Sequence, residues 1–169
     1  IVIDEKSHAL PFADVPTGYW AYDAILYVYD NGLMAGTSDT TFAPDDTTSR
    51  SMIVTILYRL EGEPVVDEAM DFTDVAGDEW YTDAVRWAAG EGIVGGYGDG
   101  LVGSDDPVTR EQLAAILYRY AVYKGYDVSI GEDTNLLSYT DFADLSEYAI
   151  PAMQWACGAG IVNGTSEST

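Results

Sequence analysis

Two arginines, Arg50 and Arg110, stand sixty positions apart, each directly after a hydroxyl residue that can start a helix. A cation at the first position of a helix is unfavourable by roughly 0.3–1 kcal/mol, because the backbone dipole makes that end partly positive. A bound anion removes this penalty, since free backbone N–H groups and a guanidinium fork converge on a carboxylate. The pattern predicts an anion-binding site at Arg110, with Thr109 beside it, and a second site at Arg50.

A structural interpretation of the two arginines stays open beside this one. Asp45 and Asp46 lie just upstream of the first arginine, and Asp105 and Asp106 lie just upstream of the second. Either arginine can pair with one of these carboxylates in an ion pair. The two roles are compatible, because an aspartate can hold an arginine that also contacts a ligand.

Two glycines and two tryptophans complete the predicted ligand-binding set. Gly36 and Gly96 occupy matching loops, where the missing side chain lets a ligand approach the backbone. Trp20 and Trp80 offer flat apolar faces that suit sugar rings. Their spacing from other apolar residues also suits a place in the hydrophobic core, so both interpretations remain for the tryptophans.

The elements that must position these residues recur along the chain. A shift of sixty positions lays residues 12–60 on residues 72–120 without a gap, and a third, truncated copy covers residues 142–169. Asp14 falls on Asp74 in this alignment, a few residues before a helix in each copy. For these two aspartates we expect a turn-capping role rather than ligand binding.

Each copy is predicted to be a helix, a glycine loop and a second helix. Gly32, Gly92 and Gly160 are each followed by an apolar residue, which is typical of a helix that ends in a Schellman motif. The second helix of the second copy begins at a capping box formed by Thr109 and Gln112. One copy is too small to bury its own apolar face, so the copies must stack on one another. The predicted fold is therefore all-α.

Composition limits the classes of partner. The 169 residues are 47% hydrophobic and carry a net charge of −22, which disfavours nucleic acids and anionic lipids as partners. No apolar run is long enough to cross a membrane. The first residues lack the basic region of a signal peptide, so we expect a mature chain or an excised piece. The single cysteine excludes an intrachain disulfide.

The second copy carries the clearest family resemblance. Its Phe-x-Asp-Val, Gly-Ile-Val-x-Gly and Gly-Asp-Gly patterns and its Thr-Arg-Glu helix start resemble the S-layer homology (SLH) domain. The signature of that family is Ile-Thr-Arg-Ala-Glu. Here the matching stretch has Glu111 in place of the alanine and Gln112 in place of the glutamate.

The other copies depart further from the family pattern. The first copy keeps Arg50 but has Met52 at the position of the signature glutamate. The third copy ends before the signature, and it carries Tyr148 where the others have Trp20 and Trp80. The resemblance thus covers nearly the whole chain but is uneven in its binding signature.

The resemblance implies a single module over residues 1–169, with repeats stacked in a pseudo-threefold bundle. It implies an extracellular place at the bacterial cell surface, where such modules anchor surface proteins to the cell wall without a covalent bond. The implied partner is a secondary cell-wall polysaccharide, often bearing a pyruvate ketal, held in grooves between repeats by the signature arginine, loop glycines and aromatic residues. No cofactor and no enzymatic activity are expected.

Three competing functions follow from the residues. Chance alone would place some pair among the 29 carboxylates at the spacing of a glycoside hydrolase, but the chain lacks a nucleophile motif and has one histidine. Calcium binding would use Asp39, Asp45 and Asp46, or Asp99, Asp105 and Asp106, and neither set matches an EF-hand loop.

The third competitor is a protein–protein or self-assembly module. The third copy stops before its second helix, which leaves an apolar groove open in the expected bundle. A neighbouring chain, or a second copy in a homo-oligomer, can supply the missing element.

Overall fold

The computed structural model describes residues 9–67, 69–131 and 133–164. In these residues the α-helices are α1 (Tyr22–Asp30), α2 (Arg50–Leu60), α3 (Thr82–Gly90), α4 (Arg110–Tyr123) and α5 (Ile150–Gly158). Three single-turn 3₁₀ helices precede α5: η1 (Leu136–Ser138), η2 (Phe142–Asp144) and η3 (Glu147–Ala149). This part of the chain forms no β-strand, which confirms the all-α prediction.

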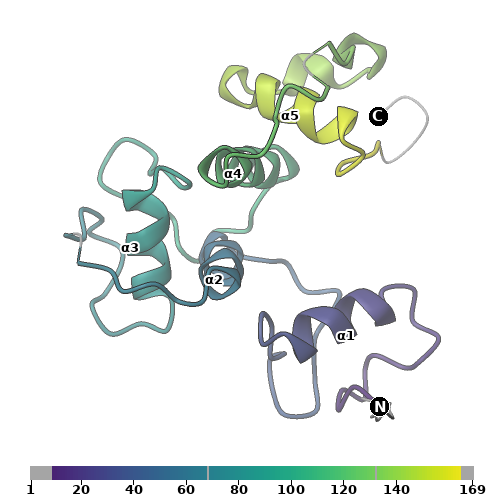
Figure 1. Ribbon diagram of the computed structural model, residues 1–169, viewed down its shortest axis with the longest axis vertical. Coiled ribbons are helices and arrows are strands. Elements are labelled where there is room, and N and C mark those ends of the chain that lie inside the picture. Colours follow the sequence, from purple (N-terminus) through teal and green to yellow (C-terminus); the bar gives the residue numbers. More distant parts are fainter. Residues whose placement is uncertain (1–8, 68, 132, 165–169) are drawn as a thin grey trace, which may run out of the picture.

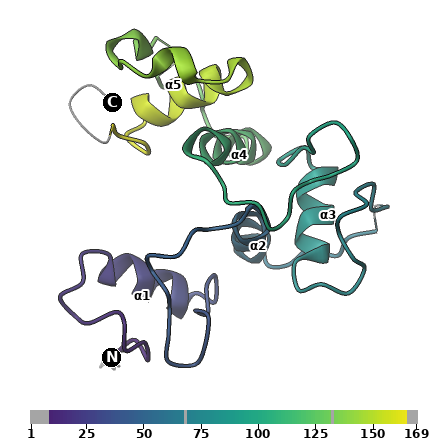
Figure 2. The same cartoon turned by 180° about the vertical axis from the view of Figure 1, so that it is seen from behind.

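The second helices of the first two copies lie at the centre of the arrangement. Figure 1 shows α2 and α4 end-on, with α3 on one side of the pair and with α1 and α5 toward the other, and Figure 2 shows the same from behind. Helix α2 packs against α3, and α4 packs against α5. Each second helix therefore packs against the first helix of the next copy, so neighbouring copies share their cores.

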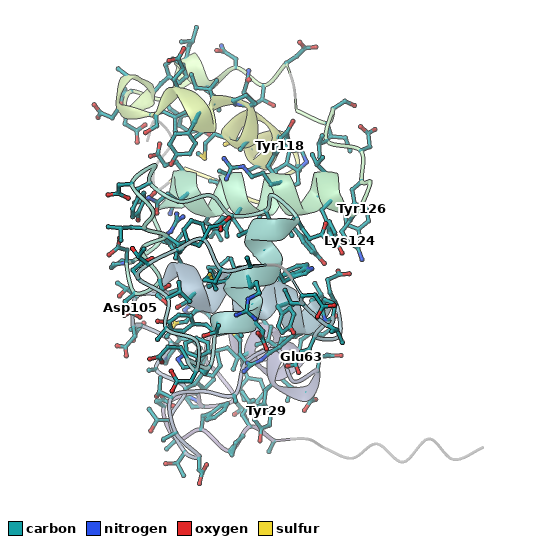
Figure 3. The ribbon with its side chains drawn as sticks, turned by 90° about the vertical axis from the view of Figure 1, so that its left-hand side faces the viewer. Tyr29, Glu63, Asp105, Tyr118, Lys124 and Tyr126 are labelled. Atoms are coloured by element: carbon teal, nitrogen blue, oxygen red, sulfur yellow. The ribbon has the colours of Figure 1, made fainter. Side chains whose placement is uncertain are left out.

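The largest hydrophobic cluster lies where α2, α3 and α4 meet. Val54 of α2, Val85 of α3 and Ile116 of α4 are all buried in it. A second cluster joins α4 and α5 through small alanines and Trp155, and a separate small cluster around Phe12 and α1 stands apart. Seen from the side, the chain runs from α1 at one end of the molecule to α5 at the other (Figure 3).

The helix boundaries follow the local signals in the sequence. Thr109 and Gln112 form the predicted capping box, with the Thr109 hydroxyl accepting from the Gln112 N–H at 3.3 Å. At the other end of the first helices, Leu33, Ile93 and Ile161 each donate a backbone hydrogen bond of 2.8 Å back into the helix, past a glycine with positive φ. These three equivalent endings confirm the predicted Schellman motifs.

Asp14 and Asp74 hold the loops that precede the second helices. The Asp74 carboxylate accepts hydrogen bonds from the N–H groups of Val102 and Gly103, at 3.0 and 2.8 Å. Asp14 does the same for Phe42 and its successor, at 3.0 and 2.7 Å. Hydrogen bonds from Phe42 lower the pKa of Asp14, while for Asp74 partial desolvation opposes the lowering but is outweighed by the loop N–H groups. The predicted structural role is confirmed.

A side-chain clamp fixes α2 against α4 at their C-terminal ends. Glu61 is the C-cap of α2, and its carboxylate accepts a hydrogen bond from the Tyr120 hydroxyl. The same carboxylate forms an ion pair with Lys124, with 2.9 Å between Nζ and Oε1. Burial first, and Glu61 second, raise the pKa of Tyr120 above its ordinary range. The clamp spans two copies, so it helps to hold the central pair of helices in register.

Candidate ligand-binding grooves

Arg50 is a buried side chain that crosses from the first copy to the second. Only 6% of its surface is exposed. Its Nε donates to the carbonyl of Val102 at 2.8 Å, and its Nη2 donates to the carbonyl of Gly95 at 2.7 Å. Its guanidinium also lies over the ring of Tyr97, 5.0 Å from the centroid. The arginine thus ties the start of α2 to the glycine loop of the next copy.

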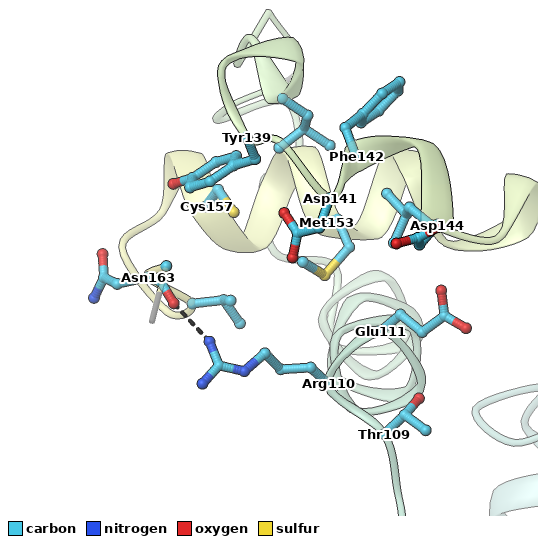
Figure 4. Close-up of a pocket in the computed structure, with 14 residues that line it drawn as sticks. Thr109, Arg110, Glu111, Tyr139, Asp141, Phe142, Asp144, Met153, Cys157 and Asn163 are labelled. Carbon is cyan, nitrogen blue, oxygen red and sulfur yellow. Dashed lines mark hydrogen bonds between the residues drawn. The ribbon is translucent and has the colours of Figure 1, made fainter. Parts of the chain in front are cut away.

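Arg110 makes the corresponding contact one copy further on. Its Nη1 donates to the carbonyl of Asn163 at 2.7 Å (Figure 4). Asn163 occupies the place in the third copy that Gly95 occupies in the second. Unlike Arg50, Arg110 is an exposed side chain, and together with Thr109 it lines a cavity of about 350 Å³ between the start of α4 and the third copy.

The structure decides the alternative of ion pairs between the two arginines and their upstream aspartates. Among the ion pairs that the described residues make, none includes Arg50 or Arg110. Both guanidinium groups bind backbone carbonyls instead. Asp106 has a different role. Its carboxylate accepts a hydrogen bond from the Tyr97 hydroxyl at 2.8 Å, and its backbone carbonyl accepts one from the backbone N–H of Arg50 at 3.1 Å.

A second cavity, of about 410 Å³, opens where all three copies meet, and we call it the junction groove. The glycine loop of the second copy forms one wall, α4 forms the floor, and the start of the third copy forms the other wall. Its lining consists of Arg50, Val94, Gly95, Gly96, Tyr97, Glu111, Gln112, Ala115, Ile116, Arg119, Ser146 and Tyr148.

The charged groups of the junction groove differ in how they are bonded to other residues of the protein. Arg119 is exposed and has no hydrogen bond or ion pair with any residue that the structure describes. Glu111, by contrast, accepts from both the backbone N–H and the hydroxyl of Ser146 at 2.9 Å, and from Tyr148 at 3.4 Å. Burial raises the pKa of Tyr148, and Glu111 adds to this, while Arg50 and Arg119 act in the opposite direction. The groove therefore offers one cation without a protein partner and one carboxylate that is held by the third copy.

Gly36 and Gly96 are required by the packing of their own loops. A Cβ on Gly96 would lie 2.6 Å from the carbonyl oxygen of Leu101 and 2.7 Å from the ring of Phe72. A Cβ on Gly36 would meet the carbonyl of Thr41 at 2.6 Å. Gly96 also lines the junction groove, whereas Gly36 lines neither cavity.

The predicted aromatic residues lie on the surface but outside both cavities. Trp20 is 88% exposed and Trp80 is 59% exposed, so neither belongs to the core, in contrast to the buried Trp87 and Trp155. Each contacts only the tyrosine beside it in sequence among ring contacts of the described part. Tyr148, which replaces these tryptophans in the third copy, does line the junction groove.

The structure thus divides the predicted set. Arg50 and Gly96 share the junction groove, and Thr109 and Arg110 share the other cavity. Sequence reasoning did not select Arg119, although the repeat alignment pairs it with Arg59 and so contained a signal.

Two further observations concern metal ligands and membrane spans in the described ranges. No group of three or more histidine, cysteine or acidic side chains there is arranged to hold a metal ion. None of the helices described is both long enough and apolar enough to span a bilayer.

The repeated helix-loop-helix units, joined by arginine-to-loop contacts, define a repeat module with grooves between its copies. The family model of the S-layer homology domain matches residues 11–51 and 71–114. The chain therefore belongs to the S-layer homology domain family.

Similar stretches occur within larger bacterial proteins. The chain is 30% identical to an endoglucanase of Bacillus sp. (strain KSM-635) over 97% of its own length, which is 17% of that protein. It is 25% identical to a cellulosome-anchoring protein of Acetivibrio thermocellus, over 86% of the chain and 34% of that protein. An S-layer protein of Bacillus licheniformis is 28% identical over 63% of the chain and 12% of its own length. The chain spans about a third or less of each of these relatives.

Proposed function

We propose that residues 1–169 act as one non-catalytic module that anchors a bacterial surface protein to the cell wall. The proposed partner is a secondary cell-wall polysaccharide, bound non-covalently outside the cell. Support comes from the family, whose members include an S-layer protein and a cellulosome-anchoring protein. The endoglucanase similarity does not argue for catalysis, because the match covers only 17% of that enzyme.

The observation that carries the proposal is Arg119 in the junction groove. In a chain with a net charge of −22, an exposed arginine without an ion pair among the described residues lines this groove and acts electrostatically on Tyr148. A guanidinium fork binds a carboxylate through two parallel hydrogen bonds. The carboxylate of a pyruvate ketal on a sugar is such a group, so a pyruvylated polymer is the ligand that we propose.

The rest of the junction groove suits the sugar to which that carboxylate is attached. Tyrosine rings pack against the apolar faces of sugars. Tyr97 and Tyr148 line the groove, and their hydroxyls donate to Asp106 and Glu111. Gly96 exposes its backbone there, and the Gln112 side chain, whose oxygen accepts from the Thr109 N–H, presents its amide nitrogen as a donor to sugar hydroxyls. A volume of about 410 Å³ lies within the roughly 300–1,000 Å³ range of small-molecule sites.

The residues first selected from sequence keep proposed roles of different kinds. Arg50 shapes the junction groove, because its Nε and Nη2 each donate to a loop carbonyl. Arg110 and Thr109 remain proposed contacts in the neighbouring cavity. Trp20 and Trp80 occupy the position of Tyr148 in their own copies, and Gly36 occupies the position of Gly96. We propose that these three residues contact ligand at the corresponding surfaces of their copies.

The net charge gives the proposal an unusual salt dependence. An anionic polymer is repelled at long range by a chain of charge −22, and salt screens this repulsion over a Debye length of about 8–10 Å near physiological ionic strength. Local contacts at Arg119 must therefore carry the binding. Association should strengthen as salt rises from low to moderate concentration, which is opposite to a site driven by a basic surface.

Sedimentation with isolated cell-wall sacculi tests the proposal. The purified chain should pellet with intact sacculi and should stay in solution after the pyruvylated polymer has been extracted from them. Pelleting that survives the extraction would contradict a polysaccharide partner. Incubation of the chain with the same glycans should release no fragment, and any released sugar would contradict the non-catalytic part.

A further inference from the structure

Tyr97 is a half-exposed residue of the junction groove, yet two neighbours fix its side chain. Its hydroxyl donates a hydrogen bond of 2.8 Å to the carboxylate of Asp106. Its ring lies against the guanidinium of Arg50, with 5.0 Å between Cζ and the ring centroid. Because two loop carbonyls hold that guanidinium, the ring rests on a cation that has little freedom to move.

The carboxylate of Asp106 belongs to a turn that is itself joined to α2. The backbone N–H of Asp106 donates to the carbonyl of Gly103 at 3.1 Å, and the backbone carbonyl of Asp106 accepts from the N–H of Arg50 at 3.1 Å. The N–H of the nearby Val108 donates to the carbonyl of Thr48 at 2.9 Å. Asp106 therefore keeps a fixed place relative to the start of α2, where Arg50 lies.

Gly103 leaves the space in which Tyr97 and Asp106 meet. A Cβ on Gly103 would lie 2.5 Å from the Asp106 carboxylate and 2.8 Å from the Tyr97 hydroxyl. The first copy has Ala43 at this position, with a φ of 60° that is unfavourable for alanine, and it has Thr37 at the position of Tyr97. The tyrosine–carboxylate pair is therefore built into the second copy and is not a feature of both copies.

The hydrogen bond to Asp106 decides what Tyr97 can offer a ligand. A phenol has a single proton, and an ionised carboxylate can only accept, so this proton is directed at Asp106. Desolvation and the bond to Asp106 both raise the pKa of Tyr97, so the phenol stays protonated at neutral pH, although Arg50 acts in the opposite direction. The phenol oxygen is left with its lone pairs and acts toward a ligand as an acceptor.

The polar groups that α4 presents to the same groove have the opposite character. The guanidinium of Arg119 can only donate. The side-chain oxygen of Gln112 accepts from the Thr109 N–H at 3.1 Å, which leaves its amide nitrogen as a donor. An anionic group is attracted to this side of the groove. At Tyr97 it would meet an oxygen lone pair instead of a proton, so that side suits a neutral donor.

We propose that Asp106 is a positioning residue of the junction groove, which acts through the hydroxyl of Tyr97. With its proton held by Asp106, Tyr97 accepts a hydrogen bond from a hydroxyl or amide N–H of the sugar, and the acidic group of the same sugar is directed to Arg119. Tyr97 is thereby a specificity-determining contact that favours one orientation of the ligand. This inference rests on the proposed binding of a polysaccharide in the junction groove.

Titration calorimetry with the soluble polysaccharide released from pyruvylated sacculi tests this role, in variants that keep the helical circular dichroism of the wild type. Tyr97→Phe retains the ring but loses the acceptor oxygen, and it should weaken binding roughly three- to tenfold. Asp106→Ala releases the hydroxyl proton and should weaken binding by a similar factor. Asp106→Asn retains an acceptor for that proton and should bind within about twofold of the wild type. The control Asp46→Asn changes the matching carboxylate of the first copy and should have no effect.

The double variant Tyr97→Phe/Asp106→Ala separates positioning from an independent role. If Asp106 acts through the hydroxyl, this variant should bind as weakly as Tyr97→Phe and no more weakly. Two losses that multiply would overturn the inference. Wild-type affinity in Tyr97→Phe, beside lost binding in Arg119→Ala, would also overturn it and would leave the proposed site intact. A wild-type chain that binds no polysaccharide would overturn both.

Discussion

The guanidinium of Arg50 donates a hydrogen bond of 2.7 Å to the carbonyl of Gly95, across the boundary between two repeats. Arg110 repeats the contact with Asn163 at 2.7 Å in the next boundary. The sequence predicted each of these helix-start arginines as an anion ligand. In the structure each arginine also fixes the loop of the next repeat to its own helix by a hydrogen bond. Stability and groove shape are linked through the same residue type.

The first prediction concerns the stability supplied by Arg50. Arg50→Ala should lower the free energy of unfolding by about 2–4 kcal/mol, because it leaves two carbonyls without a donor and opens a space under Tyr97. Arg119→Ala removes the same type of side chain from an exposed position and should change the free energy of unfolding by less than about 0.5 kcal/mol. Urea denaturation of both variants measures the difference, and equal losses would contradict the structural role of Arg50.

The second prediction concerns Gly96. Gly96→Ala should destabilise the chain by about 1–3 kcal/mol, because its Cβ would press on the backbone oxygen of Leu101 and no flexible group can yield. Gly95→Ala is the matched control, since a Cβ there meets nothing within 4 Å. Thermal unfolding should separate the two variants clearly. A Gly95 variant that is as unstable as the Gly96 variant would refute the packing explanation.

The third prediction concerns acid stability. The folded-state pKa values of Asp14 and Asp74 lie below their ordinary value, so both carboxylates stabilise the fold above the unfolded pKa near 4. This contribution should be lost as the pH falls through the lower folded values. Asp74→Asn should reduce stability at neutral pH and flatten the loss of stability as the pH falls below the unfolded pKa, as measured by urea midpoints. A variant with an unchanged acid profile would show that the loop bonds do not couple to protonation.

The fourth prediction concerns the clamp at the end of α4. Burial and Glu61 together raise the pKa of Tyr120, so its phenol should ionise after the exposed tyrosines. Glu61→Gln should lower that pKa, because it removes the negative charge beside the hydroxyl. Absorbance titration of tyrosinate at alkaline pH, with Tyr120→Phe to assign the change, reports the shift. A titration curve identical in the wild type and Glu61→Gln would contradict the clamp.

Much of the fold followed from local signals in the sequence. The capping box at Thr109, the glycine endings after Gly32 and Gly92, and the turn role of Asp74 all depend on residues close in sequence or on repeated patterns. Such interactions are short-range and have few alternatives, so spacing alone predicts them.

The site was harder to predict because its partners come from different copies. The carbonyls that bind Arg50 belong to residues 45 and 52 positions away, and backbone acceptors leave no mark in side-chain identity. Arg119 lies inside a helix, where an arginine is ordinary, and only the fold brings it into one groove with Tyr97 and Tyr148. Trp20 and Trp80 were ambiguous for the opposite reason, since their helical spacing suits a core although both are exposed.

The pelleting of Arg119→Ala with pyruvylated cell-wall sacculi tests the central claim most directly. The junction groove predicts that this variant keeps the helical signal and unfolding midpoint of the wild type but no longer pellets, while Asp39→Ala pellets normally. If a folded Arg119→Ala chain pellets as well as the wild type at the same ionic strength, the junction groove is not the site that holds the polymer.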